Sequence, residues 1–106
     1  MEFLILMKLM DEGVGDTPSE NKIILETNII PSIEMLAQME AEGKVRGGFF
    51  EGQRSAAFIM SMPSEDALDK ALSELPCANI FGIEAIPLES LGDALNRDRR
   101  ILNDLK

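Results

Sequence analysis

The alternation of hydrophobic and polar residues predicts four β-strands. The first nine or ten residues form a nearly continuous apolar run, which ends at the turn-forming residues 11–16. Apolar residues then recur at every second position on both sides of Gly52-Gln53, a pattern and a link that predict a β-hairpin. Residues 80–86 predict a fourth strand, which Pro87 should end.

A wider spacing of apolar positions predicts a long helix between the first strand and the hairpin. Thr17 is a capping residue, Pro18 suits the first helical position, and Glu20 can close a capping box. The helix should end at Gly43. Pro31 disturbs the pattern, because an interior proline lacks an amide hydrogen and costs about 3 kcal/mol. We expect one helix kinked at Pro31; the alternative is two helices with a break near residues 27–28.

The remaining segments complete an α+β fold. Ser64 should cap a second helix, which Pro76 ends, and residues 89–106 predict a charged third helix with few apolar positions. The order β-α-β-β-α-β predicts a ferredoxin-like domain with a four-stranded antiparallel sheet, followed by a C-terminal helix. A chain of 106 residues allows one domain, with a core over 1–88 and a helical extension over 89–106.

Both faces of the predicted sheet are apolar, although the two crossover helices of this topology cover only one of them. A soluble monomer rarely leaves so large an apolar face exposed. We therefore expect a homodimer in which two sheets pack face to face. The second face would be formed by alternate residues of strands one, three and four: Leu4, Leu6, Met10, Ala57, Ile59, Ile80 and Ile86.

Composition narrows the function further. Acidic residues outnumber basic ones by 19 to 10, so nucleic acid is not an expected partner. The start of the chain lacks the features of a signal peptide, and no apolar run is long enough to span a membrane, which predicts a cytoplasmic protein without membrane contact. Histidine is absent and Cys77 is the only cysteine, so we expect neither a metal site nor a cofactor. Cys77 should be a small buried residue and not a nucleophile.

The segment that includes the fourth strand resembles the closing segment of muconolactone isomerases. It has Leu75-Pro76, then six residues, then Ile83-Glu84, then two residues, then Pro87-Leu88. Gly43-Lys44 and the hairpin that begins there are also similar to this family. The resemblance covers roughly residues 2–88 and leaves out the C-terminal helix.

The resemblance implies a dimeric α+β barrel with a pocket between sheet and helices in each subunit, and proton-transfer chemistry on a lactone. The family carries a histidine, an arginine and an acid on its first strand, where this sequence has Leu4, Leu6 and Lys8. Further family polar and aromatic positions fall on residues 47–49, which are Gly-Gly-Phe. The wider superfamily also contains cofactor-independent oxygenases, haem-degrading enzymes and ligand sensors, and the lack of histidine argues against the haem group.

Lys8 and Glu84 are charges within otherwise apolar strands. If the sheet order is 4-1-3-2, the two strands are neighbours, and the residues could form a buried ion pair that donates or accepts a proton. Alternatively, each side chain reaches solvent along its own stem.

Residues of the hairpin are further candidates for ligand binding. Arg46 and Ser61 could hold a carboxylate or carbonyl group, or could simply be exposed. Phe49 and Phe50, beside the Gly47-Gly48 pair, could line a pocket for a flat molecule or could belong to the core. The glycine pair itself indicates a bulge or a close approach to the backbone.

Two functions remain open. One is an isomerase or cofactor-independent oxygenase that uses an apolar pocket between the sheet and the kinked helix, near Pro31 and Gly47-Gly48. The other is a non-catalytic ligand-binding or structural homodimer. An enzyme should have a closed pocket of roughly 300 Å³ or more with at least two convergent polar groups.

Overall fold

The computed structural model describes residues 1–105 of the chain. Four strands form a single antiparallel sheet in the order β2-β3-β1-β4. The predicted ferredoxin-like α+β fold is thus confirmed, and so is the predicted strand order, in which the first and fourth strands are neighbours. The strands are β1 (Glu2–Leu9), β2 (Val45–Phe49), β3 (Ser55–Ser61) and β4 (Phe81–Leu88).

The first crossover stays helical from residue 18 to residue 41, as the one-helix prediction required, but its irregular turn lies at residues 25–29 and not at Pro31. It begins as α1 (Pro18–Ile24), widens to a π-helical turn, η2 (Leu25–Ile29), and continues as α2 (Ile30–Ala41). Within the wide turn the Ile30 amide donates to the Leu25 carbonyl, five residues back. Pro31 has no amide hydrogen to donate to the helix. The wide turn directly before it shifts the pattern of backbone hydrogen bonds, and the chain therefore stays helical through this residue.

Side-chain caps fix where the helices begin. Thr17 accepts a hydrogen bond from the Glu20 amide at 3.2 Å. The Glu20 carboxylate accepts from the Asp16 amide at 2.7 Å, one residue earlier than a capping box requires. Ser64 caps α3 (Glu65–Ser73) as predicted, and Ser90 caps α4 (Leu91–Asp104) in the same way.

β4 is longer than the sequence pattern predicted. We expected Pro87 to end the strand, but the strand continues to Leu88 and Pro87 pairs with Phe3 of β1. β4 is an edge strand, so a proline there disturbs fewer hydrogen bonds than in the middle of the sheet.

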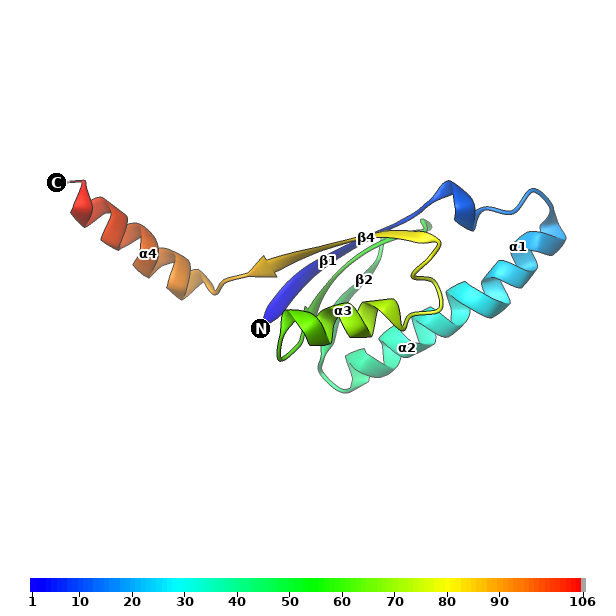
Figure 1. The fold of residues 1–106 in the computed structure, drawn as a ribbon, viewed down its shortest axis with the longest axis horizontal. Helices are drawn as coiled ribbons and strands as arrows, with labels where there is room; N and C mark the ends of the chain where they lie inside the picture. The colour runs from blue at the N-terminus through cyan, green and yellow to red at the C-terminus, as the bar shows by residue number, and fades with distance from the viewer. Residues whose placement is uncertain (106) are drawn as a thin grey trace.

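The helices α2 and α3 cover one face of the sheet and leave the other without a helix, as Figure 1 shows. The core lies under the helices, where Phe3, Ile5 and Met7 of β1 are at most 2 % exposed. Leu4 and Leu6 point to the uncovered face, called here the open face, and are half-buried.

The C-terminal helix α4 projects away from the rest of the molecule (Figure 1). The chain is accordingly elongated, with extents of 65 × 27 × 25 Å and a radius of gyration of 17.5 Å. A compact chain of this length has a radius of gyration of about 13 Å. α4 therefore does not roof the open face.

Candidate functional site

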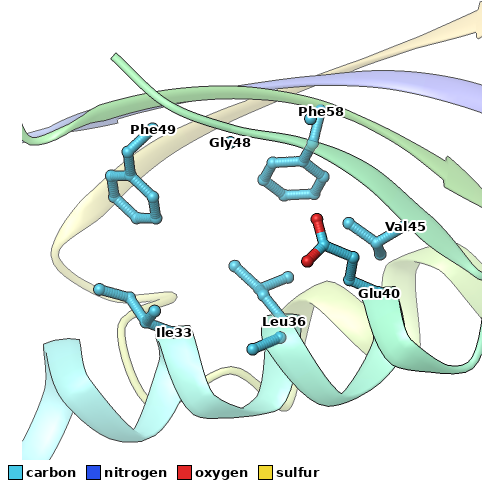
Figure 2. Close-up of a pocket in the computed structure, with 9 residues that line it drawn as sticks. Ile33, Leu36, Glu40, Val45, Gly48, Phe49 and Phe58 are labelled. Atoms are coloured by element: carbon cyan, nitrogen blue, oxygen red, sulfur yellow. The ribbon is translucent and has the colours of Figure 1, made fainter. Parts of the chain in front are cut away.

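A hollow of about 220 Å³ lies between α2 and the strands β2 and β3, on the helix-covered side of the sheet. We call it the α2–β2 pocket, and Figure 2 shows its walls. It is where the sequence pattern placed a cavity, beside Gly47-Gly48 and the helix that follows Pro31. Its lining residues are Ile33, Leu36, Ala37, Glu40, Val45, Gly47, Gly48, Phe49 and Phe58.

The two glycines of β2 form one wall of the pocket. Gly47 has a φ of 135°, and a Cβ atom there would lie 2.6 Å from the Ala57 carbonyl oxygen and from the Phe58 Cα. Only glycine allows this close approach of β2 to β3. The strands keep an unbroken register, Gly47 with Phe58 and Gly48 with Ala57, so the pair marks a close approach and not a bulge.

Glu40 is the one ionisable residue among those that line the pocket in the described chain, and the sequence analysis missed it. Its carboxylate turns from α2 into the space beneath Phe58 (Figure 2), while the residue as a whole is exposed. Its spacing from Ile33 and Leu36, seven and four residues, places it on the same side of the helix. That spacing is visible in the sequence and could have identified Glu40. It was overlooked because a charged residue on a helix usually faces solvent.

Only one of the two predicted aromatic residues lines the α2–β2 pocket. Phe49 is half-buried and lines the α2–β2 pocket. Phe50 is 47 % exposed and lies outside the pocket lining, at the start of the hairpin turn. Both phenylalanines line a second hollow of about 520 Å³, which lies beside the hairpin turn at residues 51–54.

Arg46 and Ser61 come together, but on the open face and not in the pocket. Glu2 joins them, with its carboxylate 3.2 Å from an Arg46 guanidinium nitrogen and 3.5 Å from the Ser61 hydroxyl. The side chains of Arg46 and Glu2 are 70 % and 48 % exposed, so this is a surface ion pair.

Lys8 and Glu84 also lie on the open face. Leu6 pairs with Glu84 and Lys8 pairs with Gly82, so the two charges are diagonal neighbours across β1 and β4. Both residues are exposed, and within residues 1–105 no ion pair joins them. The buried pair proposed as an alternative is not present in the single chain.

Cys77 is 2 % exposed, as expected of a residue that fills space. Burial raises the pKa of its thiol, and a hydrogen bond with Ser32 opposes that rise only in part. The buried Ser32 hydroxyl accepts from the Cys77 amide at 2.9 Å and donates to the Asn28 carbonyl at 2.7 Å. These bonds tie the wide helical turn to the loop before β4 and leave Cys77 a structural role.

Comparison with known proteins separates sequence from fold. No family model and no curated protein matches the sequence. Among solved structures, the chain is similar to the crystal structure of muconolactone isomerase, with a TM-score of 0.67 and 23 % sequence identity. The likeness covers 85 % of this chain and 90 % of that one. The chain has a muconolactone isomerase-like fold. The resemblance seen in residues 75–88 is therefore confirmed at the level of the fold.

Among the side chains that the structure describes, which leave out those of residues 12 and 106, no group of three or more acidic, histidine or cysteine residues is arranged to hold a metal ion. None of the helices within residues 1–105 is long and apolar enough to cross a membrane.

Proposed function

We propose that this protein is a homodimer that binds a compact, mainly apolar organic molecule in the α2–β2 pocket. One observation carries the proposal: every residue that lines this pocket, apart from Glu40, has an apolar side chain or is glycine. A dry apolar cavity of about 150 Å³ binds benzene in an engineered protein. A hollow of about 220 Å³ therefore has room for a molecule of one or two rings.

Glu40 defines the polar part of the ligand. An ionised carboxylate only accepts hydrogen bonds, so it favours a ligand with a hydroxyl or N–H group at one end. The ring of Phe49 lies at the end of the hollow away from Glu40, whereas the ring of Phe58 lies above the carboxylate (Figure 2). Recognition would thus combine burial of a ring with one directional hydrogen bond.

The homodimer rests on the open face. Leu4, Leu6, Ala57 and Ile59 form its half-buried centre, and Ile86 at its edge is 37 % exposed. The charges of Glu2, Arg46 and Lys8 stand around this apolar centre, as in many protein interfaces. A second copy of the same face would cover it.

Isomerase activity is a second candidate, and Glu40 favours it. A carboxylate in an apolar pocket can take a proton from one carbon of a substrate and return it to another. However, the pocket is smaller than the roughly 300 Å³ expected of an enzyme and offers one polar side chain where two were expected. Binding is therefore the function that the geometry supports better.

Indole is a suitable probe, because it has two fused rings and one N–H group. The chain has no tryptophan and no tyrosine, so indole fluorescence can be followed without background from the protein. We expect the anisotropy of indole to rise with protein concentration and to saturate, with a Kd of about 1 mM or lower. A linear, unsaturable rise would contradict the proposal.

Matched variants place the bound probe. Ala37→Leu fills the pocket from α2 and should weaken indole binding at least about tenfold, whereas Gln38→Leu, which lies outside the lining, should not. Glu40→Gln should weaken binding about fivefold, the value of one charged hydrogen bond that solvent partly screens. Glu26→Gln, on the same helix but at the surface, is its control. If Ala37→Leu and Gln38→Leu behave alike, indole binds elsewhere.

A further inference from the structure

α4 carries an apolar stripe that its own chain does not bury. Leu91, Leu95 and Leu102 are 90 %, 50 % and 57 % exposed, and Ile101 and Leu105 are 49 % and 79 % exposed. At 100° per residue these positions fall on one side of the helix. A helix with this pattern is stable when its apolar side packs against another surface.

A second exposed stripe runs along the outer side of α2. Ile30 and Ile33 are 46 % and 36 % exposed, and Ala37 and Ala41 are also exposed. By the same helical spacing these four residues share a side of α2. Ile33 and Ala37 also line the α2–β2 pocket, so this stripe forms one lip of its opening.

Charges beside the two stripes are complementary. On α2, Glu34 and Glu40 border the stripe on its two sides by helical spacing. On α4, Arg97 and Arg99 border the stripe in the same way. Arg97 forms ion pairs with Glu89 and Asp98 of its own chain. Asp98 is the one acidic residue within the stripe of α4, and this pair neutralises its charge. Arg99 pairs with no carboxylate of the described residues, so it can meet a glutamate of another helix.

The distribution of charge along the whole chain is also complementary between the C-terminal segment and the rest. Residues 1–90 hold 16 acidic and six basic side chains, whereas residues 91–106 hold three acidic and four basic ones. The C-terminal segment is therefore attracted by the acidic remainder of a molecule of the same kind.

α4 cannot reach α2 of its own chain. Only Glu89 and Ser90 join it to β4, which is one edge of the sheet, while the pocket lies at the β2 edge on the other side. Three strand spacings, about 14 Å, separate the two edges, and α4 points outward (Figure 1).

We infer that α4 of a second copy lies along the outer side of α2 and closes the α2–β2 pocket. The exchange is reciprocal, because a twofold axis gives both copies the same contact. Each pocket is then incomplete without its partner. This inference rests on the proposed function where it makes α4 a wall of the ligand site.

The face-to-face dimer places the start of α4 at the β2 edge of the partner's sheet. If the open faces stack about a twofold axis parallel to the strands, the strand order of one sheet runs opposite to that of the other. β4 of each copy then lies over β2 of its partner. Leu88, Glu2, Ser61 and Lys44 form one row across the sheet, through strand pairing and the bond from the Ser61 amide to the Lys44 carbonyl. Rotation about that axis keeps the row level, so α4 begins at the β2 edge of the partner's sheet, at the same end as Lys44. The partner's α2 lies on the covered side of that sheet (Figure 1), so α4 has to turn round the β2 edge to lie along it.

Cross-linking between two variants that each gain one exposed cysteine tests this placement. Leu95→Cys lies on the stripe of α4, and Ala41→Cys lies at the C-terminal end of α2. Cys77 can stay in both variants, because it is buried. After unfolding and refolding the two proteins together, a short bismaleimide should join them into a species with the mass of two chains. Asn96→Cys, on the opposite side of α4, is the matched control and should cross-link at least fivefold less.

Dilution separates exchange between copies from contact within one chain. The double variant Leu95→Cys/Ala41→Cys should cross-link between chains when it is pure, and refolding with a tenfold excess of unmodified protein should suppress the product. A cross-link within one chain that survives dilution would overturn the inference. Equal cross-linking of Leu95→Cys and Asn96→Cys would also overturn it.

Charge variants test the contact in a second way. Arg99→Glu should slow the cross-linking several-fold, and Arg100→Glu, on the polar side of α4, should leave its rate unchanged. Adding Glu34→Arg to Arg99→Glu should restore the rate. If Arg99→Glu and Arg100→Glu slow the reaction equally, no specific contact with Glu34 exists and the inference fails.

Indole binding distinguishes this inference from the proposed function. Leu95→Asp changes no residue of the pocket and should weaken indole binding about three- to tenfold, whereas Asn96→Asp should not. If the cross-link forms but no variant of the pocket changes indole binding, the proposed function fails and the position of α4 stands. If indole binds as proposed but the cross-link does not form, α4 is not part of the site.

Discussion

The two faces of the sheet both have apolar centres, but their surroundings differ. On β1, Ile5 is 0 % exposed beneath the helices, while its neighbour Leu6 is only half-buried on the open face. At the far edge of the open face, Leu88 of β4 is 41 % exposed. Both faces have an apolar centre, but only the covered face has a helix above it, and only the open face carries charged residues around that centre.

This difference separates stability from association. The covered face forms the core of the single chain, so its residues should determine the free energy of unfolding. The open face is a contiguous apolar surface, which in proteins usually marks a contact with another molecule. Substitutions on the two faces should therefore change different measured quantities.

Truncation on the covered face should have the largest effect. Ile5→Ala removes buried methyl groups and should lower the free energy of unfolding by about 2–5 kcal/mol in urea denaturation. That loss should not depend on protein concentration. Leu6→Ala should cost less in dilute solution and more as the concentration rises, because its partner is a second chain. Equal losses at every concentration would remove the distinction between the faces.

A charge on the open face should break the dimer. Leu6→Lys places an ammonium group at its apolar centre and should raise the dimer Kd at least 100-fold, about 2.7 kcal/mol. Sedimentation equilibrium measures this directly, with Gln53→Lys in the exposed hairpin turn as the control. The proposed dimer would be contradicted if the unmodified protein and Leu6→Lys had the same average mass across micromolar concentrations.

The two adjacent glycines of β2 differ in the same way as the two faces, because Gly47 is packed against β3 and Gly48 has open space beside it. Gly47→Ala places a Cβ atom against the backbone of β3 at a φ of 135° and should destabilise the fold by about 1–3 kcal/mol. Gly48→Ala meets no atom within 4 Å and should change stability by less than about 0.5 kcal/mol. Thermal unfolding of both variants checks the difference, and similar values would show that the close approach of β2 to β3 is unimportant.

The polar rim of the open face should have the smallest effect. Arg46→Ala removes the surface ion pair with Glu2 and should cost less than about 1 kcal/mol, with a smaller loss at high salt. Arg54→Ala, an exposed arginine of the hairpin, is the control. A loss above about 2 kcal/mol in urea denaturation would mean that the Arg46 pair is buried in the assembled protein.

Only one of the six predicted site residues lies in the pocket. Phe49 was found because an aromatic residue beside two glycines is typical of a cavity wall. The open face carries Arg46, Ser61, Lys8 and Glu84. For Arg46 the sequence already showed this, because Arg46 and Phe49 are three residues apart on one strand and must point to opposite faces of the sheet. Glu40 was missed because a helix supplies it, and only the packing of α2 against β2 shows which helical positions border a cavity.

The sequence by itself determined the order of elements, the helix caps at Thr17 and Ser64, and the apolar character of both sheet faces. These features depend on local hydrogen bonds and on residue spacing, both of which the sequence shows directly. Tertiary structure decided that Gly47 lies against β3, that Glu40 borders a hollow, and that α4 leaves the molecule with its apolar stripe exposed. Those features depend on which surfaces meet, and contacts between distant segments are fixed only when the chain packs.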